Sequence, residues 1–235
     1  MPENEGPVTF PFELAYLLRR EVIDVHTNWF QVNRGLHVLV AVILVLSGAT
    51  SNTFGALVRE EAVQAKLSLA AKCIKGKVHR PFSMDKSAKA SILFFITHDC
   101  PIANKYSREI QRIMAEYETR KMKSFLVYVD PEMNHNDVVK HMKDFGYGSQ
   151  TAFLDLRHEL VRATGAKVTP EAVVVTGRGV IAYRGRIDNL YEDLGVGRKQ
   201  VTKRELREAL DAIATGQKVP TSRTTAVGCF IPVLK

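Results

Sequence analysis

Residues 91–117 read SILFFITHDCPIANKYSREIQRIMAEY, and this stretch decides the fold. Residues 91–97 form a run rich in Ile, Leu and Phe, which is typical of a β-strand buried on both faces. Pro101 follows and suits the first turn of a helix. Apolar residues then recur at spacings of three and four, which predicts a helix with one buried face. That face consists of Ile102, Tyr106, Ile110, Ile113, Met114 and Tyr117.

Cys100 lies where this predicted strand ends and the helix begins. The first N–H groups of a helix lack partners within the helix, and the helix dipole adds partial positive charge there. This environment favours a thiolate, the nucleophile of redox chemistry. A protonated His98 would lower the pKa of the thiol further, whereas Asp99 would oppose that effect. The alternative is a small buried apolar residue, as most free cysteines are.

The composition is that of a globular protein with one substantial core. The chain has 235 residues, of which 46% are hydrophobic and 25% charged, and its formal net charge is +8. Lysine and arginine are interspersed with acidic residues rather than massed, which indicates a solvated surface. We therefore expect no nucleic-acid partner.

An apolar segment at residues 36–46, LHVLVAVILVL, is followed by the small residues Ser47, Gly48 and Ala49. A transmembrane helix needs about 20 apolar residues, whereas the core of a secretory signal needs about 7–15. The segment therefore predicts export to the periplasm, by a cleaved signal peptide or by an uncleaved anchor that tethers the protein to the membrane. The residues before this segment fit a signal peptide poorly. If translation began at Val32 instead, the segment would be preceded by the short basic sequence VNRG, as in a signal peptide. The alternative is a buried core helix or strand.

The rest of the chain alternates between strand and helix patterns and then forms a hairpin. This order predicts an α/β protein with a central mixed sheet and helices on both faces. Thr202 and Glu205 match a capping box at the start of the last helix. Strands are expected at 78–82, 123–129, 151–156, 172–176 and 180–184, and helices from Asn134 or Asn136 to 145, at 158–164 and from 202 to about 215.

Four motifs carry a resemblance to a known family. In order, they are DCPIANKY (99–106), TPEAVVV (169–175), YRGRIDNLY (183–191) and VGCFIP (227–232). Together they resemble a bacterial redoxin-domain family of thioredoxin-like fold, grouped with the alkyl hydroperoxide reductase and thiol-specific antioxidant proteins. The resemblance implies that a cis-proline loop, Thr169–Pro170, faces Cys100, and that the backbone before the proline pairs with an extended substrate. Within YRGRID, we expect a structural arginine–aspartate pair at the end of an edge strand, and the alternative is that these charges recognise an anionic partner.

The apolar segment and the resemblance together predict how the chain is divided into regions. Residues 1–49 form an N-terminal extension with the signal segment, and residues 50–75 form a linker. Residues 76–218 form the redoxin domain, and residues 219–235 form a C-terminal tail.

Two departures leave the reaction open. Dithiol oxidoreductases carry a CxxC motif at this helix start, but Ala103 stands where the second cysteine should be. Peroxiredoxins use PxxxTxxC, of which Thr97 and Cys100 match, while Leu93 stands in place of the proline. Both disulfide exchange and peroxide reduction remain candidate activities of Cys100.

Cys229 follows the small residue Gly228 in a polar tail, where its sulfur can be accessible. It is a candidate resolving thiol that would attack an oxidised Cys100, at a modest entropic cost for closing the long loop. The alternative is a cysteine that merely packs. We assign Cys73 no role.

A metal site is the second hypothesis. His98 and Cys229, with His135 or His141, offer ligands for copper or zinc, but their spacing is unspecific, and both distant histidines are expected on an exposed helix face. We therefore assign no metal and no cofactor. The sequence predicts an exported thiol oxidoreductase that acts on a protein disulfide or a peroxide and is reduced by a partner protein. The alternative is a copper carrier or docking module without turnover.

Overall fold

The computed structural model describes residues 67–83, 87–148 and 150–234. The predicted secretory segment, residues 36–46, lies outside them. Within the described part, no helix is both long and apolar enough to cross a bilayer.

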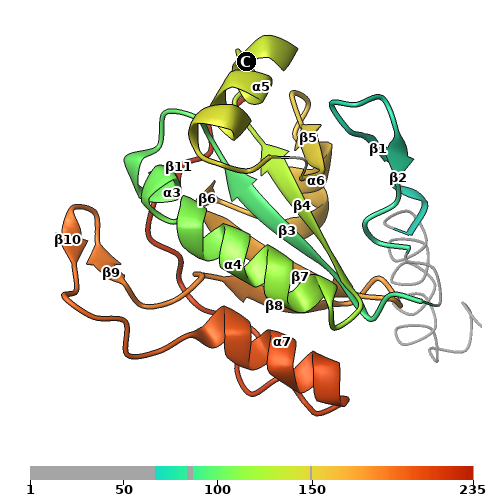
Figure 1. The fold of residues 1–235 in the computed structure, drawn as a ribbon, viewed down its shortest axis with the longest axis vertical. Helices are drawn as coiled ribbons and strands as arrows, with labels where there is room; N and C mark the ends of the chain where they lie inside the picture. Colours follow the sequence, from blue (N-terminus) through green and yellow to red (C-terminus); the bar gives the residue numbers. More distant parts are fainter. Residues whose placement is uncertain (1–66, 84–86, 149, 235) are drawn as a thin grey trace, which may run out of the picture. The chain divides into compact units, whose positions relative to one another are not determined.

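The elements follow one another in the order expected for alternating strands and helices (Figure 1). They are β1 (Ala71–Lys72), β2 (Val78–His79), β3 (Ala90–Ile96), α3 (Pro101–Lys105), α4 (Ser107–Glu118), β4 (Met122–Tyr128), α5 (His135–Asp144), β5 (Ala152–Leu154), α6 (Glu159–Thr164), β6 (Val168–Thr169), β7 (Glu171–Thr176), β8 (Ile181–Gly185), β9 (Tyr191–Asp193), β10 (Val196–Gly197), α7 (Glu205–Thr215) and β11 (Cys229–Phe230).

The central sheet has five strands in the order β5-β4-β3-β7-β8. Strand β3 is its middle member, and all of its residues are buried, as the apolar run predicts. It pairs in parallel with β4 and antiparallel with β7, so the sheet is mixed. The parallel pair requires a crossover connection, which α3 and α4 supply.

Side chains of β3 alternate between two cores. Ile92, Phe94 and Ile96 join the core that includes the buried faces of α4 and α7. Leu93 and Phe95 join the opposite core, to which α6 contributes Leu160 and the partly buried Val161. Figure 1 shows α4 and α7 on one side of the sheet and α6 on the other. The predicted mixed sheet with helices on both faces is confirmed.

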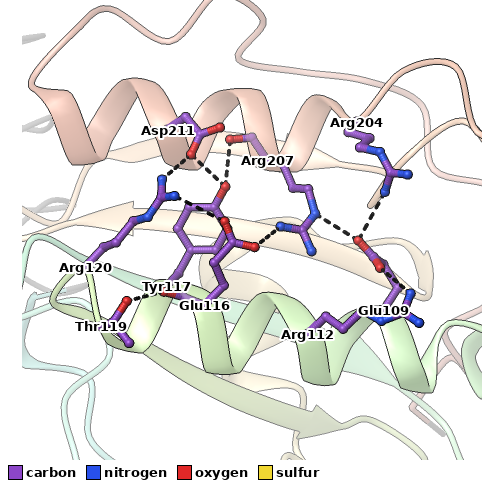
Figure 2. A network of polar contacts seen from close by, with 9 residues as sticks. All are labelled: Glu109, Arg112, Glu116, Tyr117, Thr119, Arg120, Arg204, Arg207 and Asp211. Carbon is purple, nitrogen blue, oxygen red and sulfur yellow. Dashed lines mark hydrogen bonds and ion pairs between the residues drawn. The ribbon is translucent and has the colours of Figure 1, made fainter.

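A polar network ties α7 to α4 (Figure 2). Arg207 of α7 lies between two carboxylates of α4: its Nε is 2.9 Å from Glu109, and its Nη1 contacts Glu116. The Tyr117 hydroxyl donates to Asp211 at 2.9 Å and is part of the same network. These pairs hold the last helix against the helix that follows Cys100.

The start of α7 differs from the prediction. Its N-cap residue is Arg204, without a side-chain cap, and Glu205 instead pairs with Arg186. Thr202 hydrogen-bonds with Asn189, at 2.7 Å between the Thr202 hydroxyl and the Asn189 amide nitrogen. The capping box is therefore wrong, because both of its side chains find partners in the loop after β8.

Candidate functional site

Cys100 occupies the N-cap position of α3. Its backbone is extended, with φ −76° and ψ 110°, and the Ala103 N–H donates to its sulfur at 3.4 Å. Pro101 fills the first helical position, where a missing N–H costs nothing. The residue is only 1% exposed. The strand-to-helix junction therefore places the thiol at a helix start, beneath other parts of the chain.

The proline loop lies directly against this thiol. The Thr169–Pro170 peptide bond is cis, as predicted. The Cys100 thiol donates to the Thr169 carbonyl oxygen at 3.0 Å. The hydroxyl groups of Thr97 and Thr169 lie 3.3 Å apart. Residues from the end of β3, the start of α3 and the loop after β6 thus form one site.

The C-terminal tail brings Cys229 to the same place. Strand β11 pairs antiparallel with β6, with Cys229 opposite Thr169 and Phe230 opposite Val168. Cys229 is half-buried, and its thiol lies close enough to Cys100 for each thiol to shift the pKa of the other. Figure 1 shows β11 beside β6, near the start of α3. Of the predicted site residues, the structure gathers Thr97, Cys100, Thr169, Pro170 and Cys229.

The two thiols differ in acidity. Burial acts to raise the pKa of Cys100, but hydrogen bonds from Cys229, Ala103 and Thr169 outweigh it and lower this pKa below its ordinary value. Burial, together with the hydrogen bond and charge of Cys100, raises the pKa of Cys229 to about 12. The pair therefore holds one proton preferentially on Cys229, and Cys100 is the better thiolate.

His98 and Asp99 lie at the exposed rim of the site. His98 Nδ1 is 3.6 Å from the Asp130 carboxylate, so this ring is paired with an acid. The influences that lower the Cys100 pKa are hydrogen bonds, and the charge of Asp99 acts on Cys229 by raising its pKa. Electrostatic tuning of Cys100 by His98, as the sequence suggested, has no support in this geometry.

His141 corrects the sequence prediction most clearly. It was expected on an exposed helix face but is buried, with Nδ1 2.8 Å from the Tyr128 hydroxyl and Nε2 2.8 Å from the Asn104 side-chain oxygen. The Asn104 amide in turn donates to the His98 carbonyl at 2.8 Å. Burial, with a smaller contribution from His98, lowers the pKa of His141 to about 4. The neutral ring thereby links α5 to the first helical turn after Cys100.

The metal hypothesis gains little from the arrangement. Among the described residues, the ligand-type side chains that lie close enough together to share an ion are His98, Asp99 and Asp130. Cys100 and Cys229 do not belong to this group. In the part of the chain that the structure describes, the predicted set of His98 and Cys229 with His135 or His141 therefore does not come together as a metal site.

Two residues that the sequence did not single out shape the proline loop. The buried Glu171 carboxylate accepts the Lys167 N–H at 2.7 Å and lies 3.6 Å from Arg184 Nε. Gly228 packs so closely on the loop that a Cβ there would lie 2.6 Å from the Thr169 carbonyl carbon. The motifs TPE and VGC contain both residues, but only the fold reveals these contacts.

The YRGRID motif also differs in its partners. Arg184 donates to the Gly165 carbonyl at 2.7 Å and faces Glu171. Asp188 accepts from the Tyr106 hydroxyl at 2.6 Å rather than from an arginine. The expected arginine–aspartate pair is wrong, because the arginines of this motif pair with glutamates from β7 and α7.

This topology, with a cysteine at a helix start opposite a cis-proline, defines a thioredoxin-like thiol protein. The AhpC/TSA family model matches residues 59–184, and the chain belongs to that family. The predicted redoxin-type resemblance is therefore confirmed. The match ends at residue 184, so it does not cover the tail or Cys229.

Two solved structures are similar in fold. A hypothetical protein from Sinorhizobium meliloti is 23% identical, with a TM-score of 0.59 over 69% of this chain and 89% of its own. An uncharacterized conserved protein from Geobacillus kaustophilus is 24% identical, with a TM-score of 0.62 over 71% of this chain and 88% of its own. A search of the curated proteins finds no match.

Proposed function

We propose that the protein is a thiol oxidoreductase in which Cys100 is the nucleophile and Cys229 the resolving thiol. One observation carries the proposal: the β6–β11 pairing sets Cys229 opposite Thr169, the residue whose carbonyl oxygen accepts from the Cys100 thiol. The missing second cysteine of a CxxC motif is thereby supplied from the other end of the domain.

The pKa difference assigns the roles. The thiolate is the attacking species, and the thiol with the lower pKa supplies it. With the pKa of Cys100 lowered and that of Cys229 raised, the first attack belongs to Cys100. Cys229 remains protonated until Cys100 has reacted and its negative charge has been removed. Its pKa then falls, which favours the second attack.

Two oxidants fit this sequence. With a hydroperoxide, the Cys100 thiolate attacks the distal oxygen, the O–O bond breaks, the alcohol leaves with one added proton, and Cys100 becomes a sulfenic acid. Cys229 then displaces water and forms the Cys100–Cys229 disulfide. With a disulfide RSSR, Cys100 forms a mixed disulfide and releases one thiol, and Cys229 releases the second. A dithiol partner protein restores both thiols and is itself oxidised to a disulfide.

The test is to oxidise the reduced protein with each oxidant and to map its disulfides by mass spectrometry. Trypsin places the cysteines in separate peptides, residues 73–75, 90–105 and 224–235. We expect a bond between the last two peptides. In the Cys229→Ser variant, we expect Cys100 to stop at a sulfenic acid or mixed disulfide. Oxidation without a Cys100–Cys229 bond would refute the proposed pairing.

We also propose that the protein is exported and works in the periplasm, released or tethered at residues 36–46. The length of this segment and the small residues after it support export. An oxidising compartment also suits a disulfide cycle. N-terminal sequencing of the protein from cell fractions is the test. A cytosolic protein that retains residues 1–49 would contradict this proposal.

A copper carrier is the second candidate. Two adjacent thiols are soft ligands that suit copper(I) as a transferred ion, which is the observation that favours it. Copper(I) titration of the reduced protein and of its Cys100→Ser and Cys229→Ser variants tests this role. Stoichiometric binding that needs both thiols, without turnover of either oxidant, would favour the carrier over the enzyme.

A further inference from the structure

The tail, residues 219–234, contacts the domain at two places. The first contact is at strand β8, where the Arg184 N–H donates to the Ser222 carbonyl at 3.0 Å and the Thr224 N–H donates to the Arg184 carbonyl at 3.1 Å. The Thr224 hydroxyl also lies 2.8 Å from the Tyr183 hydroxyl. A Cβ at Gly185 would lie 2.9 Å from the Thr224 nitrogen, so close approach of the tail requires glycine there.

The second contact is at strand β6. There β11 pairs antiparallel with residues 168–169, and the Ile231 N–H donates to the Lys167 carbonyl at 3.0 Å. Gly228 allows this approach, because a Cβ there would overlap the Thr169 carbonyl group. The backbone edge before the proline is thus hydrogen-bonded to the chain's own tail.

This edge is the one that an extended peptide would use. A peptide binds a free strand edge through backbone hydrogen bonds, and its affinity comes from the groups that the tail already engages. The tail also covers the thiol, since Cys100 is buried and its sulfur contacts Cys229. A polypeptide disulfide must displace β11 before its sulfur can meet Cys100. A small oxidant needs only a local opening beside the half-buried Cys229.

We propose that the C-terminal tail is a specificity element that occupies the docking edge of β6 and restricts Cys100 to oxidants of low molecular mass. The inference rests on the proposed function and narrows its substrate class to hydroperoxides or small disulfides. Gly228 is the residue on which the tight fit of the tail depends.

The test compares access to Cys100 in the full-length wild type and in two tail variants. Gly228→Ala places a methyl group against Thr169, and Ile231→Pro removes the hydrogen bond to Lys167. Gly197→Ala is the matched control, because a Cβ there meets its nearest neighbour at an ordinary 3.7 Å. The probes are N-ethylmaleimide and a maleimide carried on an extended peptide of about ten residues, a length that covers a strand edge.

Alkylation is read on the tryptic peptide 90–105. In the wild type and Gly197→Ala, we expect the peptide reagent to react with Cys100 far more slowly than N-ethylmaleimide. In Gly228→Ala and Ile231→Pro, the ratio of the two rates should rise about tenfold or more, since each lost strand contact frees the edge. Circular dichroism checks that both variants are folded, and faster amide exchange at residues 167–169 checks that the tail has been released. If both checks are met and the ratio of the two alkylation rates is still that of the wild type, the inference is overturned.

The oxidant itself is tested with hydrogen peroxide, oxidised glutathione and a disulfide-linked pair of extended peptides. The inference expects oxidation of wild-type Cys100 by at least one of the first two and much slower oxidation by the third. Wild-type reaction with the peptide disulfide at the rate of oxidised glutathione would refute it. A missing Cys100–Cys229 bond would instead refute the proposed function, because the alkylation ratio does not depend on resolution by Cys229.

Discussion

Replacing Cys229 with alanine should raise the pKa of Cys100. Of the groups that lower this pKa, the Cys229 thiol has the largest effect, whereas burial acts to raise the pKa. Cys229→Ala removes that thiol donor and leaves the thiolate with the hydrogen bonds of Ala103, Thr169 and the backbone of residue 229. The direction is therefore upward, and Cys100 should be less ionised at neutral pH.

The size of the shift follows from the value of one such bond. A hydrogen bond to a charged group contributes about 1.5–3 kcal/mol. One pKa unit corresponds to about 1.4 kcal/mol, so the full bond would give one to two units. Because the tail leaves Cys229 half-exposed, water can replace part of this bond. We therefore expect a rise of about one pKa unit, at the lower end of that range.

The assay is the rate of Cys100 alkylation by iodoacetamide as a function of pH, read on peptide 90–105. The midpoint of this curve reports the pKa and is independent of how easily the reagent enters. Phe230→Ala is the control, because this neighbouring side chain is 79% exposed. A midpoint that stays in place or falls in Cys229→Ala would refute the reasoning that the tail thiol stabilises the Cys100 thiolate.

Three further predictions concern groups around the site. The pKa of His141 is lowered from 6.5 to about 4, so the unfolded chain takes up a proton first. The contribution of the neutral His141 to the free energy of unfolding is then fully present above pH 6.5. It should fall by up to about 3 kcal/mol as the pH drops from 6.5 to 4. In His141→Gln, this loss in urea unfolding should shrink, whereas the exposed His135→Gln should retain it; equal pH profiles would contradict the assignment. Arg207→Met removes the cation that bridges Glu109 and Glu116 and should cost about 1–3 kcal/mol of unfolding free energy. Arg112→Met removes one pair from an arginine that is 71% exposed and should cost under about 0.5 kcal/mol, so equal losses would argue against the network in Figure 2. Glu171→Gln replaces the acceptor of the Lys167 N–H by a neutral amide and should speed amide exchange at residues 167–168 several-fold, a response expected for hydrogen bonds that lose their charge. Exchange that stays at the wild-type rate would mean that the proline loop does not need this carboxylate.

Local patterns in the sequence were sufficient for the centre of the fold. Strand β3 is buried on both faces, and the helical positions Ile110, Ile113 and Tyr117 are all buried, as their spacing indicates. These features depend on periodicity within one segment, and periodicity is visible in a single sequence. The helix is nevertheless divided at Tyr106, between α3 and α4, and no pattern predicts that break.

Partner choice between segments could not be predicted in the same way. The polar residues Thr202 and Glu205 match a capping box, but in the structure Thr202 hydrogen-bonds with Asn189 and Glu205 pairs with Arg186 instead. His141 is buried because Tyr128 and Asn104 satisfy both of its ring nitrogens. Such partners lie on elements that only the tertiary fold brings together, so the sequence alone leaves several pairings equally open.

The docking of the tail connects the reactivity of Cys100 to its selectivity. Helix α3 has only five residues, so its dipole is short, and the Ala103 N–H of this helix donates to the sulfur. The other hydrogen bonds that lower the Cys100 pKa come from Thr169 and Cys229, which meet through the β6–β11 pairing. Any substrate that displaces β11 therefore also removes an interaction that lowers the Cys100 pKa. A large substrate would meet Cys100 with a smaller fraction of thiolate, whereas a small oxidant would meet Cys100 with its hydrogen-bonding partners in place.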